Sequence, residues 1–143
     1  MIDTRTAPYA VLLLRVALGV MFLAHAWLKI SVFTVPGFGG FLEKVGYPAV
    51  LAWPIVLAEV FGGLALILGL YSRAVAVALL PVLIGATLVH VPNGWVFSAP
   101  NGGWEYPAFL VVATLAQALA GDGALALRPT VLPGVAAGTP RHA

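Results

Sequence analysis

Four long apolar segments take up most of this chain and limit its fold more than any other feature. They cover residues 8–30, 49–70, 73–91 and 105–120. A helix needs about 20 apolar residues to cross roughly 30 Å of hydrocarbon, so each segment is long enough or nearly so. Only 8% of the residues are charged and 62% are hydrophobic, which excludes a water-soluble domain and a disordered chain. The pattern predicts an all-α integral membrane protein built as a four-helix bundle.

The stretch between the first two segments, residues 31–47, has a different pattern. After a Pro-Gly turn, Phe38, Phe41, Leu42 and Val45 follow one another at helical spacing, with polar or small residues between them. An amphipathic helix of this length fits the membrane interface better than a span. We therefore expect a short interfacial helix between spans one and two.

Charged and turn-forming residues predict the topology and the domain limits. Four arginines lie at the end of the bundle that holds both termini: Arg5, Arg73, Arg128 and Arg141. Only Lys29 and Lys44 lie at the other end, so the positive-inside rule predicts that both termini are cytoplasmic. We expect residues 1–127 to form one four-span domain. From Gly121 onwards, proline and glycine occur without an apolar period, so we expect a chain that is loose or ordered by a partner. Residues 128–143 are predicted to be a flexible tail.

Composition also excludes several kinds of site. The chain has no cysteine, so it supplies no disulfide, no cysteine-ligated metal and no ligand for an iron–sulfur cluster. The chain has seven basic and five acidic residues, and the basic residues do not cluster in a run. This argues against nucleic acid as a partner.

Ionisable residues inside the spans are the first candidates for chemistry, because each is costly to place in lipid. At about 100° per residue, Arg15, His25 and Lys29 share one face of the first span. Counting along the helices puts Arg15 and Glu59 of the second span in the same half of the bundle. We expect these two residues to form a structural ion pair, with a proton-handling or ligand-binding Glu59 as the alternative.

Two glycines follow Glu59 by one helical turn. Gly62 and Gly63 allow another helix backbone to approach closely, or leave room for a flat ligand beside the carboxylate. Both are therefore candidate ligand-binding residues.

A second polar group is predicted at the end of the bundle away from the termini. The count places His25 and Lys29 there, with His90 ending the third span and Glu105 starting the fourth. Such a group could deliver a proton to a quinone oxygen, with Lys29 and Trp104 contacting the ligand. Haem held by His25 and His90 is a weaker alternative, and the spacing favours no metal site.

Each of these residues also has a plain structural interpretation. His90 could hydrogen-bond at the interface, Lys29 could extend to it, and Glu105 could cap the fourth helix. Trp104 could be one of several aromatic anchors at the membrane surface.

The ordered set of motifs resembles the DoxX family of small prokaryotic membrane proteins over roughly residues 12–127. The resemblance rests on His25-Ala26-Trp27-Leu28-Lys29, Glu59, Gly62-Gly63, Leu68-Gly69-Leu70, Arg73, His90 and Gly102-Gly103-Trp104-Glu105-Tyr106-Pro107. Two departures are visible: Ala26 replaces a usual glycine, and Ala126-Leu127-Arg128 replaces a Ser-Leu-Asp-like tripeptide. The second departure puts a function of the tail in doubt.

The resemblance implies a four-helix protein of the prokaryotic cytoplasmic membrane, in a family named from a subunit of a thiosulfate:quinone oxidoreductase. The leading hypothesis is a membrane subunit of a quinone-linked oxidoreductase or redox-stress complex, incomplete without a soluble oxidoreductase subunit. In that hypothesis His25, His90 and Glu105 line the quinone site, and Arg15 with Glu59 forms a buried polar relay. The alternatives are a non-catalytic anchor for a soluble oxidoreductase and a small-solute carrier or channel. A homo-oligomer is a further possible assembly.

Overall fold

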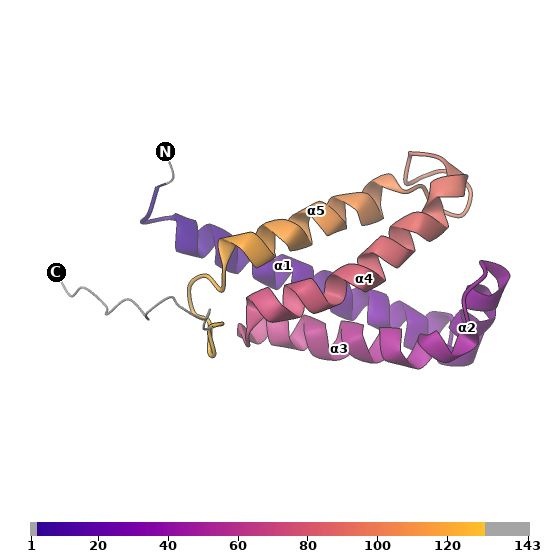
Figure 1. Cartoon of the computed structure of the whole chain (residues 1–143), viewed down its shortest axis with the longest axis horizontal. Helices are drawn as coiled ribbons and strands as arrows, with labels where there is room; N and C mark the ends of the chain where they lie inside the picture. Colours follow the sequence, from indigo (N-terminus) through magenta and orange to yellow (C-terminus); the bar gives the residue numbers. More distant parts are fainter. Residues whose placement is uncertain (1–2, 131–143) are drawn as a thin grey trace.

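The computed structural model describes residues 3–130, and this part of the chain is helical with no strand (Figure 1). It contains five α-helices: α1 Ala7–Trp27, α2 Val35–Lys44, α3 Ala52–Leu68, α4 Ser72–His90 and α5 Glu105–Ala120. Three short turns extend them: a π-helical turn at Leu28–Val32 after α1, and 3₁₀ turns at Ala49–Leu51 before α3 and Val91–Asn93 after α4. The predicted all-α fold is confirmed.

Three helical segments are long and apolar enough to cross a membrane. They are Ala7–Val32 with 26 residues, Ala49–Leu68 with 20 and Ser72–Asn93 with 22. Each begins and ends close to a predicted span. The fourth predicted span forms α5, a shorter apolar helix of 16 residues. A helix was also expected between the first two spans, and α2 forms there. Four membrane crossings and cytoplasmic termini remain predictions.

Local sequence signals explain where these helices begin and end. Pro8 lies in the first turn of α1, where a missing N–H has no cost. The Thr34 hydroxyl accepts a hydrogen bond from Gly37 N at 3.2 Å and so caps α2. Gly69 ends α3 in the left-handed conformation (φ 69°), and a Cβ there would overlap the Arg15 guanidinium. Glycine is therefore required at position 69 for both backbone and packing.

The helices pack as two pairs, α1 against α3 and α4 against α5 (Figure 1). α1 and α3 touch through glycines: a Cβ on Gly19 would lie 2.7 Å from the Gly63 carbonyl oxygen. A Cβ on Gly62 would lie 2.8 Å from the Leu79 side chain of α4. Both glycines after Glu59 therefore serve helix packing, and neither lines the cavity described below.

A buried apolar layer joins the two pairs. Its members come from α1, α3, α4 and α5: Leu18, Phe22, Leu66, Leu79, Leu83, Leu110 and Ala113. Beyond this layer, towards α2, the pair α4 and α5 diverges from α3 (Figure 1). We call this side the α2 end and the opposite side the termini end.

At the termini end, residues 121–130 fold back across the helix ends, and we call this segment the strap. Asp122 accepts hydrogen bonds from Ser72 N and Thr130 N, both at 2.8 Å. Arg128 exchanges backbone hydrogen bonds with the chain just after α3. The expectation of a loose chain from Gly121 is therefore wrong for the strap. The rest of the predicted tail, residues 131–143, lies outside the described residues, as does Arg141.

Candidate functional site

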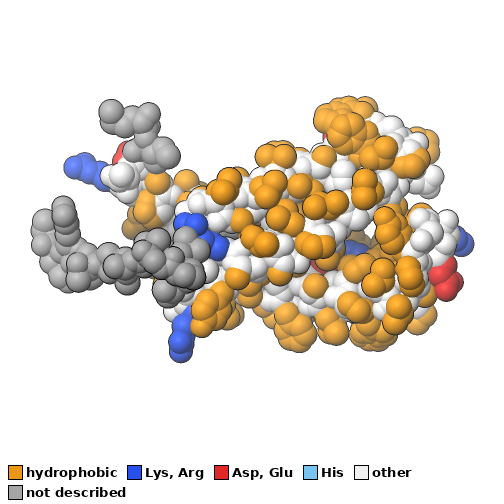
Figure 2. Space-filling model, viewed as in Figure 1, with side chains coloured by type: hydrophobic (Ala, Val, Ile, Leu, Met, Phe, Trp, Pro, Cys, Tyr) orange, Lys and Arg blue, Asp and Glu red, His pale blue; other side chains and the backbone are white. Residues whose placement is uncertain are grey.

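A cavity of about 1530 Å³ opens at the α2 end between the two diverging helix pairs. Figure 2 shows the surface hollowed between α2 and the loop that joins α4 to α5, with apolar side chains on both sides. Part of the apolar layer, including Leu18, Phe22 and Leu83, forms its floor. Its lining is mostly apolar and includes seven titratable side chains: His25, Lys29, Tyr47, Glu59, His90, Glu105 and Tyr106.

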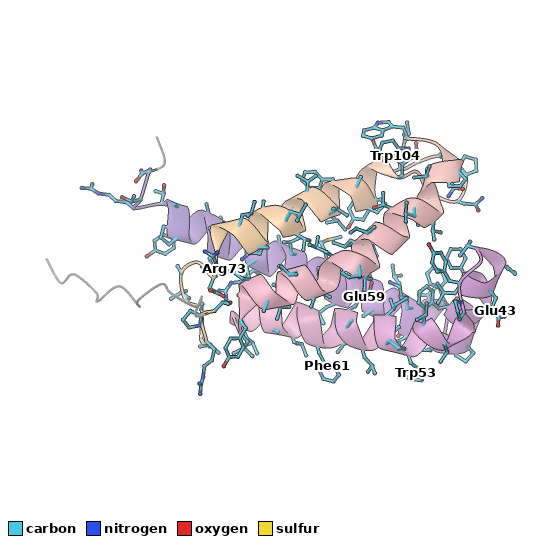
Figure 3. The ribbon with its side chains drawn as sticks, viewed as in Figure 1. Glu43, Trp53, Glu59, Phe61, Arg73 and Trp104 are labelled. Carbon is cyan, nitrogen blue, oxygen red and sulfur yellow. The ribbon has the colours of Figure 1, made fainter. Side chains whose placement is uncertain are left out.

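A buried ion pair between Lys29 and Glu59 lies on the wall of this cavity. Lys29 Nζ is 2.7 Å and 2.8 Å from the two Glu59 carboxylate oxygens, and the side chains are 15% and 5% exposed. Lys29 belongs to the π-helical turn, and its Nζ also lies 5.3 Å from the centre of the Phe38 ring on α2. Figure 3 shows Glu59 along the length of α3, away from its ends. Two spans and α2 thus meet at one charged contact.

The predicted partner of Glu59 was Arg15, and that prediction is wrong. Gly19 and Gly63 touch, which fixes how α1 lies along α3. Arg15 is one turn from this contact towards the termini end, and Glu59 is one turn towards the α2 end, so they lie about 12 Å apart along the bundle. A helical side chain also leans towards the N-terminus of its own helix. In antiparallel helices these two side chains lean apart, whereas those of Lys29 and Glu59 lean together.

Arg15 instead belongs to a separate polar layer at the termini end. It is 1% exposed, and its Nη2 donates a hydrogen bond to the Ala124 carbonyl of the strap at 3.1 Å. Its Nε and Nη1 have no partner among the described residues. The apolar layer separates Arg15 from the cavity, so Arg15 is not a candidate for ligand binding there.

Both predicted histidines line the cavity, and both are held in the same way. The Nδ1 atoms of His25 and His90 lie 2.8 Å and 2.7 Å from backbone carbonyls one turn earlier, those of Met21 and Ala86. Because a carbonyl oxygen only accepts, each Nδ1 carries the proton, and Nε2 remains an acceptor in the neutral ring. The fold therefore fixes the tautomer of both rings and leaves one nitrogen of each free for a ligand.

Glu105 lines the cavity and orders the loop beside it. Its Oε1 accepts a hydrogen bond from Phe97 N at 2.7 Å, and its own N–H donates to the Trp95 carbonyl at 3.1 Å. The Trp95 and Trp104 rings pack edge to face with their centres 4.5 Å apart. Trp95 lines the cavity and Trp104 does not; Trp104 packs on Trp95 in the loop, and its ligand contact stays a prediction.

The donor set limits what the cavity could hold. Among residues 3–130, no three His, Cys, Asp or Glu side chains come close enough together to hold a metal ion. The titratable groups are an ammonium, two carboxylates, two imidazoles and two phenols, which are suited to hydrogen bonding and proton transfer.

The family model described as DoxX matches residues 10–91. The chain belongs to the DoxX family. The matched range contains both cavity histidines and the Lys29–Glu59 pair, whereas Glu105 lies beyond it. A protein of Bacillus subtilis (strain 168), named "Putative oxidoreductase CatD", is 33% identical over 124 residues, covering 86% of this chain and 87% of that protein. No solved structure matches the chain. The membership of this family and the long apolar helices together identify an integral membrane protein.

Two titratable cavity residues of this DoxX protein, Tyr47 and Tyr106, were not candidates in the sequence analysis. Tyr106 stacks on His25, with ring centres 5.8 Å apart and planes 21° from parallel. Its hydroxyl is buried and has no hydrogen-bond partner among the described residues. Helical spacing could have found it, because Tyr106 lies one turn from Leu110 and two turns from Ala113 on the buried face of α5.

Proposed function

We propose that this DoxX protein is a membrane subunit of a quinone-linked oxidoreductase and that its cavity binds the quinone as substrate. The observation that carries the proposal is the Lys29–Glu59 ion pair on the wall of a large, mostly apolar cavity. A charged pair is costly among membrane helices and is a mark of function there. The oxidoreductase name of the Bacillus subtilis relative supports the same class of activity.

The cavity's chemistry fits a quinone. An apolar ring with carbonyl oxygens needs an apolar pocket with a few hydrogen-bond donors at fixed places. Lys29 Nζ has a third N–H beyond the two that face Glu59, and a protonated imidazole of His25 or His90 would donate through Nε2. Reduction of a quinone to a quinol adds two electrons and two protons. In this proposal a soluble oxidoreductase subunit supplies the electrons from its own substrate, and the cavity's titratable groups relay the protons.

The proposal includes a topology. We propose that α5 is a fourth span, because its 16 residues reach about 24 Å and it lies beside α4. Arg5, Arg73 and Arg128 lie at the termini end, which favours cytoplasmic termini in a prokaryotic cytoplasmic membrane. In that orientation the cavity lies in the outer half of the bilayer.

Gly85 offers a direct test of the cavity. It lies in α4 and lines the cavity, and a Cβ there would meet no atom within 4 Å. Gly85→Leu therefore adds a side chain at the cavity wall whose Cβ meets no neighbour. Since leucine favours helix over glycine by roughly 0.8 kcal/mol, stability should be kept or raised. The matched control is Gly40→Leu in α2, which is equally free of contacts and lies outside the cavity.

The assay is mass spectrometry of quinone retained by the gently solubilised protein, followed by binding of decylubiquinone to purified protein in nanodiscs. We expect the wild type and Gly40→Leu to bind and Gly85→Leu to lose binding. If Gly85→Leu binds decylubiquinone as well as the wild type does, the ligand site lies outside the cavity. A wild type without quinone, but with a stoichiometric soluble partner, would favour the anchor function. Solute flux into liposomes would favour a carrier.

A further inference from the structure

An open groove lies on the outer face of α4 and α5 at the termini end, away from the large cavity. Its volume is about 490 Å³, and its lining residues are Arg73, Ala74, Val77, Ala78, Ala118 and Thr130. None of them lines the large cavity. The α4 members Ala74, Val77 and Ala78 are exposed, and α4 is long and apolar enough to cross a membrane. The groove therefore lies on the surface that this helix turns towards lipid.

Arg73, the second residue of α4, brings a partly exposed cation to this groove at the termini end (Figure 3). Its guanidinium packs over Gly121 of the strap, where a Cβ would lie 2.8 Å from Nη2. Arg73 forms no ion pair and no side-chain hydrogen bond with any described residue. The carboxylate of the strap, Asp122, instead accepts from Ser72 N, Thr130 N and the Thr130 hydroxyl. The guanidinium therefore keeps hydrogen-bond donors for a ligand in the groove.

The cation and the apolar groove together suit a phosphate group that carries a hydrocarbon chain. A guanidinium binds phosphate through two parallel, charge-assisted hydrogen bonds. The N-terminus of α4 adds partial positive charge at the same place. Ala74 and Ala78 lie one turn apart on α4, and Ala118 lines the groove from α5, so small side chains leave room beside the guanidinium. A free phosphate ion would use the cation and leave the apolar part of the groove empty.

We propose that Arg73 and the groove bind one anionic phospholipid, with its phosphate on the guanidinium and an acyl chain that begins along Ala74 and Ala78. The end of a spanning helix lies at the level of the lipid head groups, so the bilayer itself supplies this ligand. Arg5 and Arg128 lie at the same end, and their charge favours a head group with net negative charge over a zwitterionic one. The lipid site does not depend on the quinone function or on the orientation of the chain.

The experiment is native mass spectrometry of the purified full chain in detergent, titrated with phosphatidylglycerol or with phosphatidylcholine. We expect the wild type to bind phosphatidylglycerol more tightly than phosphatidylcholine. Arg73→Gln should weaken phosphatidylglycerol binding about tenfold, the worth of one charge-assisted hydrogen bond. The matched control is Arg5→Gln, which removes an exposed arginine at the same end and should bind like wild type.

A second pair of variants tests the groove while Arg73 stays in place. Ala78→Leu fills part of the groove and should weaken phosphatidylglycerol binding about fourfold, the worth of one buried methylene. Ala10→Leu, at an exposed position of α1 outside the groove, should bind like wild type. Inorganic phosphate added as a competitor should not displace the lipid.

Three other results would overturn the proposal. If Arg73→Gln and Arg5→Gln weaken phosphatidylglycerol binding equally, only the total charge of the termini end matters. If inorganic phosphate displaces the lipid, or if Ala78→Leu binds it like wild type, the guanidinium recognises a phosphate group alone and the groove holds no chain. The melting temperature without added lipid should be unchanged in Arg73→Gln, because no described partner is lost. A lower melting temperature would mean that Arg73 serves the fold and not a lipid.

Discussion

Removing one member of the Lys29–Glu59 pair should cost far more stability than removing both. The two side chains are 15% and 5% exposed, so Glu59→Leu leaves an ammonium, and Lys29→Met a carboxylate, in a largely apolar wall. Breaking a buried pair costs about 3–5 kcal/mol. Because Lys29 borders an open cavity, we expect a value near the lower limit, about 3 kcal/mol for each single substitution. Replacing both charges with apolar groups is often neutral. The double variant should therefore unfold within about 1 kcal/mol of wild type.

The assay is equilibrium unfolding in mixed micelles, read by tryptophan fluorescence, for the wild type, both single variants and the double variant. The control pair is Lys44→Met with Glu43→Leu, two neighbouring exposed residues of α2, where each change should stay within about 0.5 kcal/mol. Figure 3 shows Glu43 at the α2 end of the molecule. The reasoning would be refuted if the losses of unfolding free energy in the two single variants added up to the loss in the double variant. Additivity would mean that the two charges do not depend on each other. The double variant should fold but lose quinone binding, because the ammonium donor of Lys29 is absent.

Two further substitutions test the helix packing and the strap. Gly19→Ala places a Cβ 2.7 Å from the Gly63 carbonyl and should destabilise the bundle by about 1–3 kcal/mol in the same unfolding assay, as α1 and α3 must separate. Unchanged stability would mean that the close contact is not required. Asp122→Ala removes the acceptor of Ser72 N and Thr130 N, and we expect faster proteolysis within residues 121–130 while the helices stay intact. Unaltered cleavage would show that other contacts hold the strap.

The sequence alone predicts the helices of this protein well, because their lengths follow from a strong local signal. Apolar runs bounded by proline, glycine and charge place the segments Ala7–Val32, Ala49–Leu68 and Ser72–Asn93 to within a few residues. The spacing of apolar residues from Phe38 to Val45 likewise predicts α2. These features depend on neighbours a few positions apart, which a single sequence displays directly.

The ion pair could not be found by counting residues along the helix axes. Such a count treats each side chain as a point at its Cα, whereas the side chains of Lys29 and Glu59 extend towards each other along the bundle. The direction rule for helical side chains would have excluded Arg15 from the sequence alone once two antiparallel helices were assumed. The contact between Gly19 and Gly63, which sets the exact lengthwise position of α1 against α3, is visible only in the structure.

The ordered strap could not be predicted from the sequence, for a different reason. Its proline and glycine content resembles that of a flexible tail, but Gly121 and Gly123 adopt positive φ angles that let the chain turn back on the helix ends. The bonds that hold it are long-range, and the contact from Asp122 to Ser72 spans 50 residues. The cavity was equally hidden, since it arises from the divergence of two helix pairs and not from any local pattern.

The apolar layer lies between the cavity and the polar layer around Arg15, and it limits the side from which a quinone in the cavity could exchange protons. Leu18, Phe22 and Leu83 form both the floor of the cavity and the centre of the buried core, so the cavity's titratable groups face the α2 end. Arg15 lies beyond this floor, tied to the strap at the termini end. In the proposed function, the protons taken up on quinone reduction enter from the α2 end, through groups such as Glu105 at the start of α5. In the same proposal, the buried arginine and the strap hold the helix ends together, and the quinone chemistry is confined to the half of the bundle that the diverging helices open.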